Sequence, residues 1–205
     1  MSKATVASLA GLGGIGGGLG AYKLYSSSGV EKSISSGTIE DRLKAEEFSI
    51  LGTEPSDEAN WTKIKEAYEK VKTDPTKAFS EKSGDLKDLC KAALSKQETD
   101  SDYPKAKRWC VVPISLSSHL NKLGFKSLSS QDDASNPDKT KWENMVTEHK
   151  KDENKSKRIS DLGSLDNEGW KVIMKKCKEI GDKQNYDDEF TSKFENYKDW
   201  CSEKN

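Results

Sequence analysis

Hydrophobic residues along most of the chain fall into short groups with the spacing of one helix face. The clearest group contains Leu86, Leu89, Cys90, Ala93 and Leu94, at positions i, i+3, i+4, i+7 and i+8. Polar and charged residues lie between them, as in a helix with one buried and one solvated face. Comparable stripes begin near Thr38, Trp61, Asp102, Leu116, Trp142, Trp170 and Phe190. The pattern predicts a mainly α protein built from short helices.

Local signals mark where several of these helices begin and end. Thr38, with Asp41 three residues later, predicts an N-terminal capping box, and Asp85 predicts a second helix start. Gly124 and Gly181 each follow a stripe and predict a helix end.

Polar segments separate the stripes and are predicted to be loops, at residues 73–84, 131–141 and 150–157. No stretch alternates convincingly between apolar and polar residues. Trp109–Ile114 is a candidate for one short extended segment. We therefore expect little or no sheet.

The stripes occur twice in the same order. The matched residues are Leu43 and Phe48 with Leu120 and Phe125, Trp61 with Trp142, Cys90 with Cys177, and Trp109-Cys110 with Trp200-Cys201. The offset between partners grows only across loops, and Trp and Cys are rare residue types. We predict two degenerate helical repeats, residues 38–113 and 114–205. A unit this small buries little apolar area by itself, so packing between halves or crosslinks would be needed.

The four cysteines are placed to supply such crosslinks. In each half one cysteine lies on the third helix and the other at the end of the fourth. If those helices form an antiparallel hairpin, the favoured pairs among the three connectivities are Cys90–Cys110 and Cys177–Cys201. Each bond would contribute about 3 kcal/mol. The alternative is that all four are reduced, buried core residues.

The N-terminal stretch Ala4–Tyr22 contains no charged residue and differs from everything after it. Nineteen helical residues would reach roughly 28 Å, close to the ~30 Å hydrocarbon core of a bilayer. Seven of them are glycine, and the i, i+4 repeat that includes Gly13 and Gly17 suits close approach of two membrane helices. We predict a Gly-rich hydrophobic helix within residues 1–25, a membrane anchor or signal segment, followed by a Ser/Gly linker over 26–37.

Several interpretations of residues 1–25 remain open. An uncleaved anchor, a cleaved signal peptide with a poor cleavage site, and a flexible tail that does not insert all fit the composition. Gly11, Gly13 and Gly16 match the dinucleotide pattern G-x-G-x-x-G. No strand–helix–strand unit surrounds them, so we interpret the match as chance.

Composition narrows the possible functions of the rest of the chain. The 205 residues include 34 Lys and Arg against 35 Asp and Glu, and the signs are interleaved. Nucleic-acid binding requires a net basic face, so we predict no nucleic-acid partner. Hydrophobic residues make up only 32% of the chain, which predicts a thin core. Five Trp, six Tyr and five Phe are nevertheless too many for a disordered protein.

No group of residues forms a recognisable catalytic motif. His119 lies among serines and is expected at the surface, whereas His149 lies on an apolar stripe and is expected to be partly buried. Neither has the spacing of a zinc ligand, and the sequence contains no C-x-x-C. We therefore predict no catalytic, cofactor-binding or metal-binding residue, and no enzyme.

Several segments resemble a large paralogous family of uncharacterised proteins from haemotropic mycoplasmas. They are the Gly/Ala-rich start ending in YKLY, then DRLKAEEFSIL, WTKIKEAY, LKDLCK, KRWCVVP and the closing YKDWC. The resemblance covers essentially the whole chain. It implies a membrane-associated or exported protein of a wall-less bacterium that attaches to red cells. It also implies a role in surface variation, and hence in host contact or immune evasion.

Together these features predict a single-pass protein of the cell membrane with its C-terminal domain outside, or a secreted protein if the first segment is cleaved. The expected partners are the membrane and a host-cell surface protein. The expected role is a non-enzymatic one in host interaction or antigenic variation. The alternative is a structural protein of the cell envelope that associates with itself through the glycine face.

Overall fold

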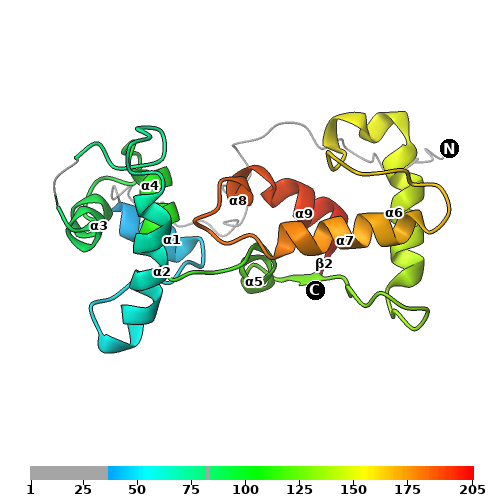
Figure 1. Ribbon diagram of the computed structural model, residues 1–205, viewed down its shortest axis with the longest axis horizontal. Helices are drawn as coiled ribbons and strands as arrows, with labels where there is room; N and C mark the ends of the chain where they lie inside the picture. The colour runs from blue at the N-terminus through cyan, green and yellow to red at the C-terminus, as the bar shows by residue number, and fades with distance from the viewer. Residues whose placement is uncertain (1–36, 82–83) are drawn as a thin grey trace, which may run out of the picture. The chain divides into compact units, whose positions relative to one another are not determined.

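The computed structural model describes residues 37–81 and 84–205, and it is mainly α as predicted (Figure 1). The predicted anchor or signal segment at 1–25, and the predicted linker at 26–37 except for Gly37, lie outside the described residues. The elements, in chain order, are α1 (Ile39–Ala45), η2 (Pro55–Asp57), α2 (Glu58–Glu69), α3 (Leu86–Leu94), α4 (Tyr103–Trp109), α5 (Leu116–Lys122), β1 (Phe125–Ser127), α6 (Lys139–Lys150), η3 (Asp152–Lys157), α7 (Gly169–Gly181), α8 (Glu189–Ser192), α9 (Phe194–Cys201) and β2 (Ser202–Lys204).

Side-chain caps begin several of these helices. The Thr38 hydroxyl accepts a hydrogen bond from the Asp41 N–H at 3.2 Å, and the Asp41 carboxylate accepts one from the Thr38 N–H at 2.9 Å, completing the predicted capping box. Asp85 caps α3 through the N–H of Lys87, also as predicted. Ser115 caps α5. These bonds satisfy backbone donors that a helix leaves unpaired at its start.

Some predicted boundaries were wrong. The last apolar stripe is divided into α8 and α9, with Lys193 between them. Part of the predicted loop 150–157 is the 3-10 helix η3. Residues 125–127 and 202–204 form an antiparallel two-stranded sheet, in which Ser127 pairs with Ser202. Three residues are too few to display a period of two, so the sequence pattern contains no sign of these strands.

All the described residues belong to one compact unit. Within it we call residues 38–113 the first half and residues 114–205 the second half. In Figure 1, α6 of the second half runs across α7, and the two helices pack directly on each other. Trp142 of α6 and Ile173 of α7 are among the most deeply buried side chains, as are Leu43 and Trp109 in the first half.

In each half, a backbone hydrogen bond joins the start of the first helix to a loop later in the same half. In the first half, the N–H of Ile39 donates to the carbonyl of Lys96 at 2.9 Å. In the second, the N–H of Leu116 donates to the carbonyl of Lys183 at 2.8 Å. Both bonds stand beside an isolated antiparallel bridge, from Thr38 to Gln97 and from Ser115 to Gln184.

The later part of each half is also held by a shared backbone contact. The N–H of Leu51 donates to the carbonyl of Cys110, and the N–H of Leu128 donates to the carbonyl of Cys201, both at 3.0 Å. Val111 bridges to Ile50, so the predicted extended segment Trp109–Ile114 contributes one bridge. In the second half the same region widens into the β1–β2 pair.

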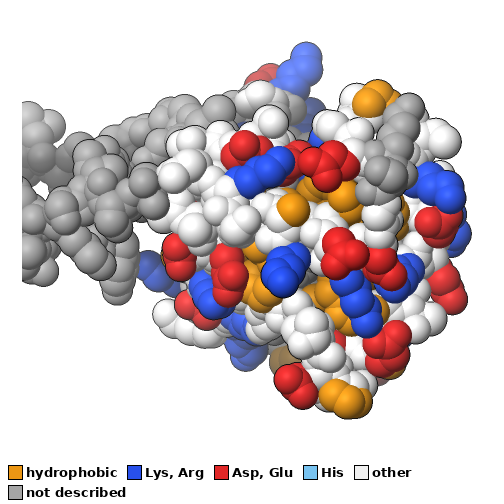
Figure 2. All heavy atoms as spheres, turned by 90° about the vertical axis from the view of Figure 1, so that its left-hand side faces the viewer, with side chains coloured by type: hydrophobic (Ala, Val, Ile, Leu, Met, Phe, Trp, Pro, Cys, Tyr) orange, Lys and Arg blue, Asp and Glu red, His pale blue; other side chains and the backbone are white. Residues whose placement is uncertain are grey.

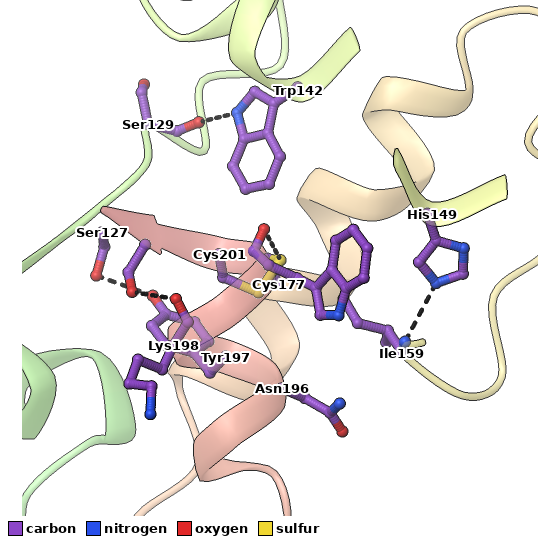
Figure 3. The surroundings of a disulfide bond; sticks show 12 residues. Ser127, Ser129, Trp142, His149, Ile159, Cys177, Asn196, Tyr197, Lys198 and Cys201 are labelled. Atoms are coloured by element: carbon purple, nitrogen blue, oxygen red, sulfur yellow. Dashed lines mark hydrogen bonds between the residues drawn. A yellow bond between two sulfur atoms is a disulfide. The ribbon is translucent and has the colours of Figure 1, made fainter. Parts of the chain in front are cut away.

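Disulfide bonds connect the cysteines in the predicted pairs. Cys90 bonds to Cys110 and Cys177 to Cys201, with Cα–Cα distances of 5.3 and 5.4 Å. Both distances are ordinary for a disulfide. Figure 3 shows the second bond, which ties α7 to the end of α9. All four cysteines are buried, so the crosslinks run through the core of each half.

Candidate functional site

The buried tryptophans connect each disulfide-bonded hairpin to a loop. Trp109 of the first half donates its indole N–H to the carbonyl of Lys77, and Trp200 of the second donates to the carbonyl of Lys157, both at 2.7 Å. Lys77 lies in the loop after α2, whereas Lys157 is the last residue of η3, directly before the next loop. The indole bond therefore holds each loop against the helix that carries the tryptophan.

A second tryptophan in each half does the same for the turn before its own helix. Trp61 of α2 donates to the carbonyl of Gly52 at 2.8 Å. Trp142 of α6 donates to the carbonyl of Ser129 at 2.9 Å, a bond drawn in Figure 3. Four buried indoles thus take backbone carbonyls as acceptors, two in each half.

Tyr68 completes this arrangement in the first half. Its ring meets the ring of Trp109 edge-on at 5.2 Å, and its hydroxyl oxygen accepts a hydrogen bond from the N–H of Phe79 at 3.2 Å. Burial raises the pKa of the Tyr68 hydroxyl. The group therefore stays neutral throughout the physiological range, and its oxygen remains an acceptor.

His149 occupies the corresponding place in the second half. Its ring lies 5.1 Å from the ring of Trp200, and its Nε2 accepts a hydrogen bond from the N–H of Ile159 at 3.1 Å (Figure 3). A backbone N–H can only donate, so Nε2 carries no proton and the neutral ring has its proton on Nδ1. Burial is the largest cause that lowers the pKa of His149, and the positive charge of Arg158 acts in the same direction.

His119 was predicted to lie at the surface, and this prediction was wrong. Its side chain is only 2% exposed. His119 lies three residues after Leu116 and one before Leu120 on α5, and both leucines are fully buried. That i, i+3 spacing, rather than the neighbouring serines, indicates that His119 lies on the buried face of α5.

The ring of His119 connects the two halves. Its Nε2 lies 2.9 Å from the carbonyl oxygen of Glu46 in the first half. A carbonyl can only accept, so Nε2 carries the proton. The other ring nitrogen, Nδ1, is buried and has no hydrogen-bond partner among the described residues. Phe48 of the first half meets the ring edge-on at 4.0 Å, and Phe190 of the second half stacks on it at 6.0 Å.

Charges near His119 oppose its protonation. Burial is the main cause that lowers its pKa to about 4, and Lys107 and Lys122 lower it further. The carboxylate of Glu46 acts in the opposite direction. The ring is consequently neutral at physiological pH.

Glu46 gathers several donors beside this contact. Its carboxylate accepts hydrogen bonds from the Tyr103 hydroxyl at 2.5 Å and from the Lys107 ammonium at 2.9 Å. Burial opposes ionisation of the carboxyl group, but Lys107 and the hydrogen bond from Tyr103 outweigh it, so the pKa of Glu46 is lowered. Arg42 adds a third donor at 3.3 Å.

Two further residues of the second half hold the junction. The buried side-chain amide of Asn185 donates to the carbonyl of Arg108 at 3.0 Å, and its oxygen accepts from the N–H of Ile114 at 2.9 Å. The Asp188 carboxylate lies 2.7 Å from both Lys77 and Arg108. We use the word junction for the contacts between the halves, namely Asn185 with Arg108, Asp188 with Lys77 and Arg108, and His119 with Glu46.

The rest of the described surface offers no obvious reaction centre. An open hollow of about 390 Å³ beside α7 is lined by Lys176, Glu179, Ile180, Asp182, Lys183, Glu189 and Lys193. Its charges largely neutralise one another, since Lys183 pairs with Glu189 at 2.8 Å and Lys176 with Glu179 at 3.2 Å. Over residues 37–81 and 84–205, no group of three or more His, Cys, Asp or Glu side chains is placed to hold a metal ion.

Comparisons with known proteins identify no relative of this chain. A scan against protein-family models, a search of curated proteins and a search of solved structures each returned no match. Within the part of the chain that the structure describes, every helix is too short or too polar to span a bilayer.

Proposed function

We propose that the two halves are copies of one disulfide-bonded helical unit, and that the protein is a membrane-anchored surface protein without enzymatic activity. Its proposed role is host interaction or antigenic variation. The duplication rests on contacts that recur in the same order: a cap, a backbone pairing, two indole–carbonyl bonds and a disulfide. Because these contacts involve buried backbone atoms, they are harder to produce by chance than a similarity of composition.

The observation that carries the functional proposal is that the two halves share buried contacts but differ in their exposed side chains. On α2 and α6 the inward positions keep their roles, with Trp61 matched by Trp142 and Tyr68 by His149. The exposed positions between them differ, as in the pairs Thr62 and Glu143, Lys63 and Asn144, Glu66 and Thr147, and Glu69 and Lys150. A set of buried contacts that tolerates different exposed residues suits a protein whose surface varies while its fold is kept.

The character of the exposed side chains agrees with that role. Figure 2 shows Lys and Arg side chains alternating with Asp and Glu over one face of the molecule, with small apolar areas between them. Such a face favours contact with a protein over contact with nucleic acid, which requires one dominant positive sign.

The disulfides support a position outside the cytoplasm. Disulfide bonds persist in oxidising compartments and on cell surfaces and are rare in a reducing cytosol. With a predicted anchor in residues 1–25, the proposed topology is single-pass with residues 38–205 outside. If the first segment is cleaved, the proposed protein is secreted.

Location can be tested on the native protein in intact cells. We expect an intact mass that retains the first segment, no reactive thiol before reduction and four after it, and labelling of lysines by a reagent that does not cross membranes. A cytoplasmic protein subjected to the same reagent is the control. Four free thiols in the native protein, or complete protection from the reagent, would refute the external location.

Host contact can be tested by binding of the full chain to red-cell membranes. We expect saturable binding at micromolar concentration, which reduction and alkylation of the disulfides abolishes. Absence of saturable binding would count against adhesion.

The alternative function, a self-associating envelope protein, is favoured by the i, i+4 glycines and predicts that crosslinking of intact cells yields homo-oligomers. Substitution of Gly13 and Gly17 by Leu would abolish them.

A further inference from the structure

Both histidines of the chain are in the second half, and both rings are buried in the neutral form. His149 accepts a backbone hydrogen bond through Nε2, while His119 donates through Nε2 and keeps an unprotonated Nδ1 in a buried position. Their exposed fractions are 6% and 2%. Protonation therefore requires a buried positive charge at both places.

At His149, protonation removes an acceptor. A proton on Nε2 would face the N–H of Ile159, which has no way to accept it. The charged group that faces the ring from the neighbouring segment is Arg158, whose Nη2 donates to the carbonyls of Lys150 and Lys151 at 2.8 and 3.0 Å. On α9 the ring meets the edge of Trp200. The positive charge of Arg158 therefore disfavours a second positive charge on the ring.

The corresponding residue of the first half lacks this property. Tyr68 accepts from the N–H of Phe79 as His149 accepts from Ile159, but a phenol does not gain a proton in the physiological range. The same loop contact is thus independent of mild acid in one half and sensitive to it in the other.

At His119, protonation adds a donor with nowhere to donate. The groups that face the ring are Lys107 of α4, Lys122 of α5 and the carboxylate of Glu46, while Phe48, Phe190 and Phe194 surround its faces and edges. The Glu46 carboxylate is already engaged by Tyr103 and Lys107. The equivalent position of the first half is Arg42, whose side chain is partly exposed and pairs with Glu46.

We propose that the second half and its junction with the first half act as an acid-operated release. Protonation of His119 opens the junction. Protonation of His149 releases residues 157–159, which bond to Trp200 and to the end of α6. The first half keeps its fold under the same conditions. This proposal concerns the conformational response of the chain and does not depend on the proposed host-contact role.

The direction and window follow from linkage. The pKa of His119 is about 4 in the folded chain against an ordinary value of 6.5. Between those values the unfolded or released state binds more protons, so stability is complete above pH 6.5 and falls as the pH decreases toward 4. Relative to neutral pH, protonation of His119 alone lowers the ratio of closed to open states about 30-fold at pH 5. His149 adds to this in the same direction.

Several paired carboxyl groups in both halves have pKa values shifted away from the pH range of the test. Asp41, Glu46 and Asp85 in the first half, and Asp138 and Asp188 in the second, have pKa values lowered from ordinary values near 4. They become protonated only at more acidic pH, where both halves would lose stability.

The experiment follows the indole N–H signals of the ¹⁵N-labelled full chain by NMR between pH 7 and pH 5. Trp61 and Trp109 report the first half, and Trp142 and Trp200 report the second. We expect the second pair to broaden or move to the position of a solvent-exposed indole while the first pair is unchanged. Loss of both pairs together, or no change in either pair, would overturn the proposal.

Matched substitutions locate the cause. His149→Tyr installs the residue that the first half uses, and His119→Gln keeps a side-chain donor that does not titrate. The doubly substituted chain should retain all four signals at pH 5, as at pH 7. Tyr68→His should make the signals of Trp61 and Trp109 acid-sensitive as well. If the double variant responds to acid as the parent does, the histidines are not responsible and the proposal fails.

Discussion

The two halves use one set of contacts but fill one of them with chemically different acceptors. Tyr68 and His149 each meet a buried tryptophan edge-on and accept the N–H of a loop residue. Packing requires a flat ring with one acceptor at that point, and it does not require a particular functional group. The difference teaches that two halves with matching contacts can differ in how an individual contact responds to pH.

A second difference lies where the halves meet. His119 of the second half inserts between Phe48 and Phe190, whereas its counterpart Arg42 extends over the ring of Tyr103 at 3.6 Å. One copy of this position is therefore an internal contact and the other is a partly exposed cation. If the halves are copies of one unit, as proposed above, a polar residue at the outward-facing copy of this position is expected.

The largest expected effect tests whether Trp109 and Trp200 contribute equally to the stability of the two halves. Trp109→Ala and Trp200→Ala each remove a large buried ring and its bond to a loop carbonyl. We expect each to lower the free energy of unfolding by about 3–5 kcal/mol, measured by urea denaturation. A loss from one substitution several-fold greater than from the other would contradict a shared role.

The disulfides provide the next test. We expect removal of either bond, by Cys90→Ala with Cys110→Ala or by Cys177→Ala with Cys201→Ala, to lower the free energy of unfolding by about 3 kcal/mol. The two values should be similar because the sequence separations are 20 and 24 residues. Full reduction of the parent chain is the control and should cost at least as much as either pair. An undiminished unfolding midpoint in one variant would show that its bond is dispensable.

The junction can be weakened without touching either half's core. Asn185→Ala removes the donor to Arg108 and leaves the N–H of Ile114 without its acceptor. We expect a loss of about 1–3 kcal/mol, measured by urea denaturation. The matched control is Glu98→Ala at the corresponding position of the first half, for which we expect a change within about 0.5 kcal/mol. Equal losses from the two substitutions would contradict a junction role for Asn185.

The smallest expected effect comes from the helix caps. Thr38→Ala and Ser115→Ala each remove the side-chain acceptor at the start of the first helix of a half. We expect each to cost about 1 kcal/mol in thermal or urea denaturation. Thr38→Ser and Ser115→Thr keep the acceptor and should be close to neutral. A cost confined to one half would sharpen the comparison, since it would show that only one cap is needed.

Much of the helical structure was predictable because its signals are local. The stripe that contains Leu86 and Leu94 predicts α3, and Asp85 begins it in the structure as in the prediction. The cysteine pairs followed from the order of helices in a hairpin, because that order brings the two ends together. Strands β1 and β2 were missed because each has three residues, which is too short for a pattern.

The candidate site was less predictable. The i, i+3 relation between Leu116 and His119 indicates the buried face of α5, but the serines beside it suggested exposure. Nothing local indicates the partner of His119, since Glu46 lies 73 residues away and contributes a backbone carbonyl. Every residue has the same backbone carbonyl, so the sequence contains no sign of which carbonyl accepts the hydrogen bond.

The sequence by itself indicated most of the buried apolar stripes, the starts of α1 and α3, and the favoured cysteine pairs, because these depend on apolar spacing and on the order of elements. The tertiary structure decided which carbonyl each indole meets, how His119 and Asn185 connect the halves, and that His149 stands where the first half has Tyr68 as an acceptor. Those contacts depend on where distant backbone atoms lie after folding, and backbone atoms are the same in every residue.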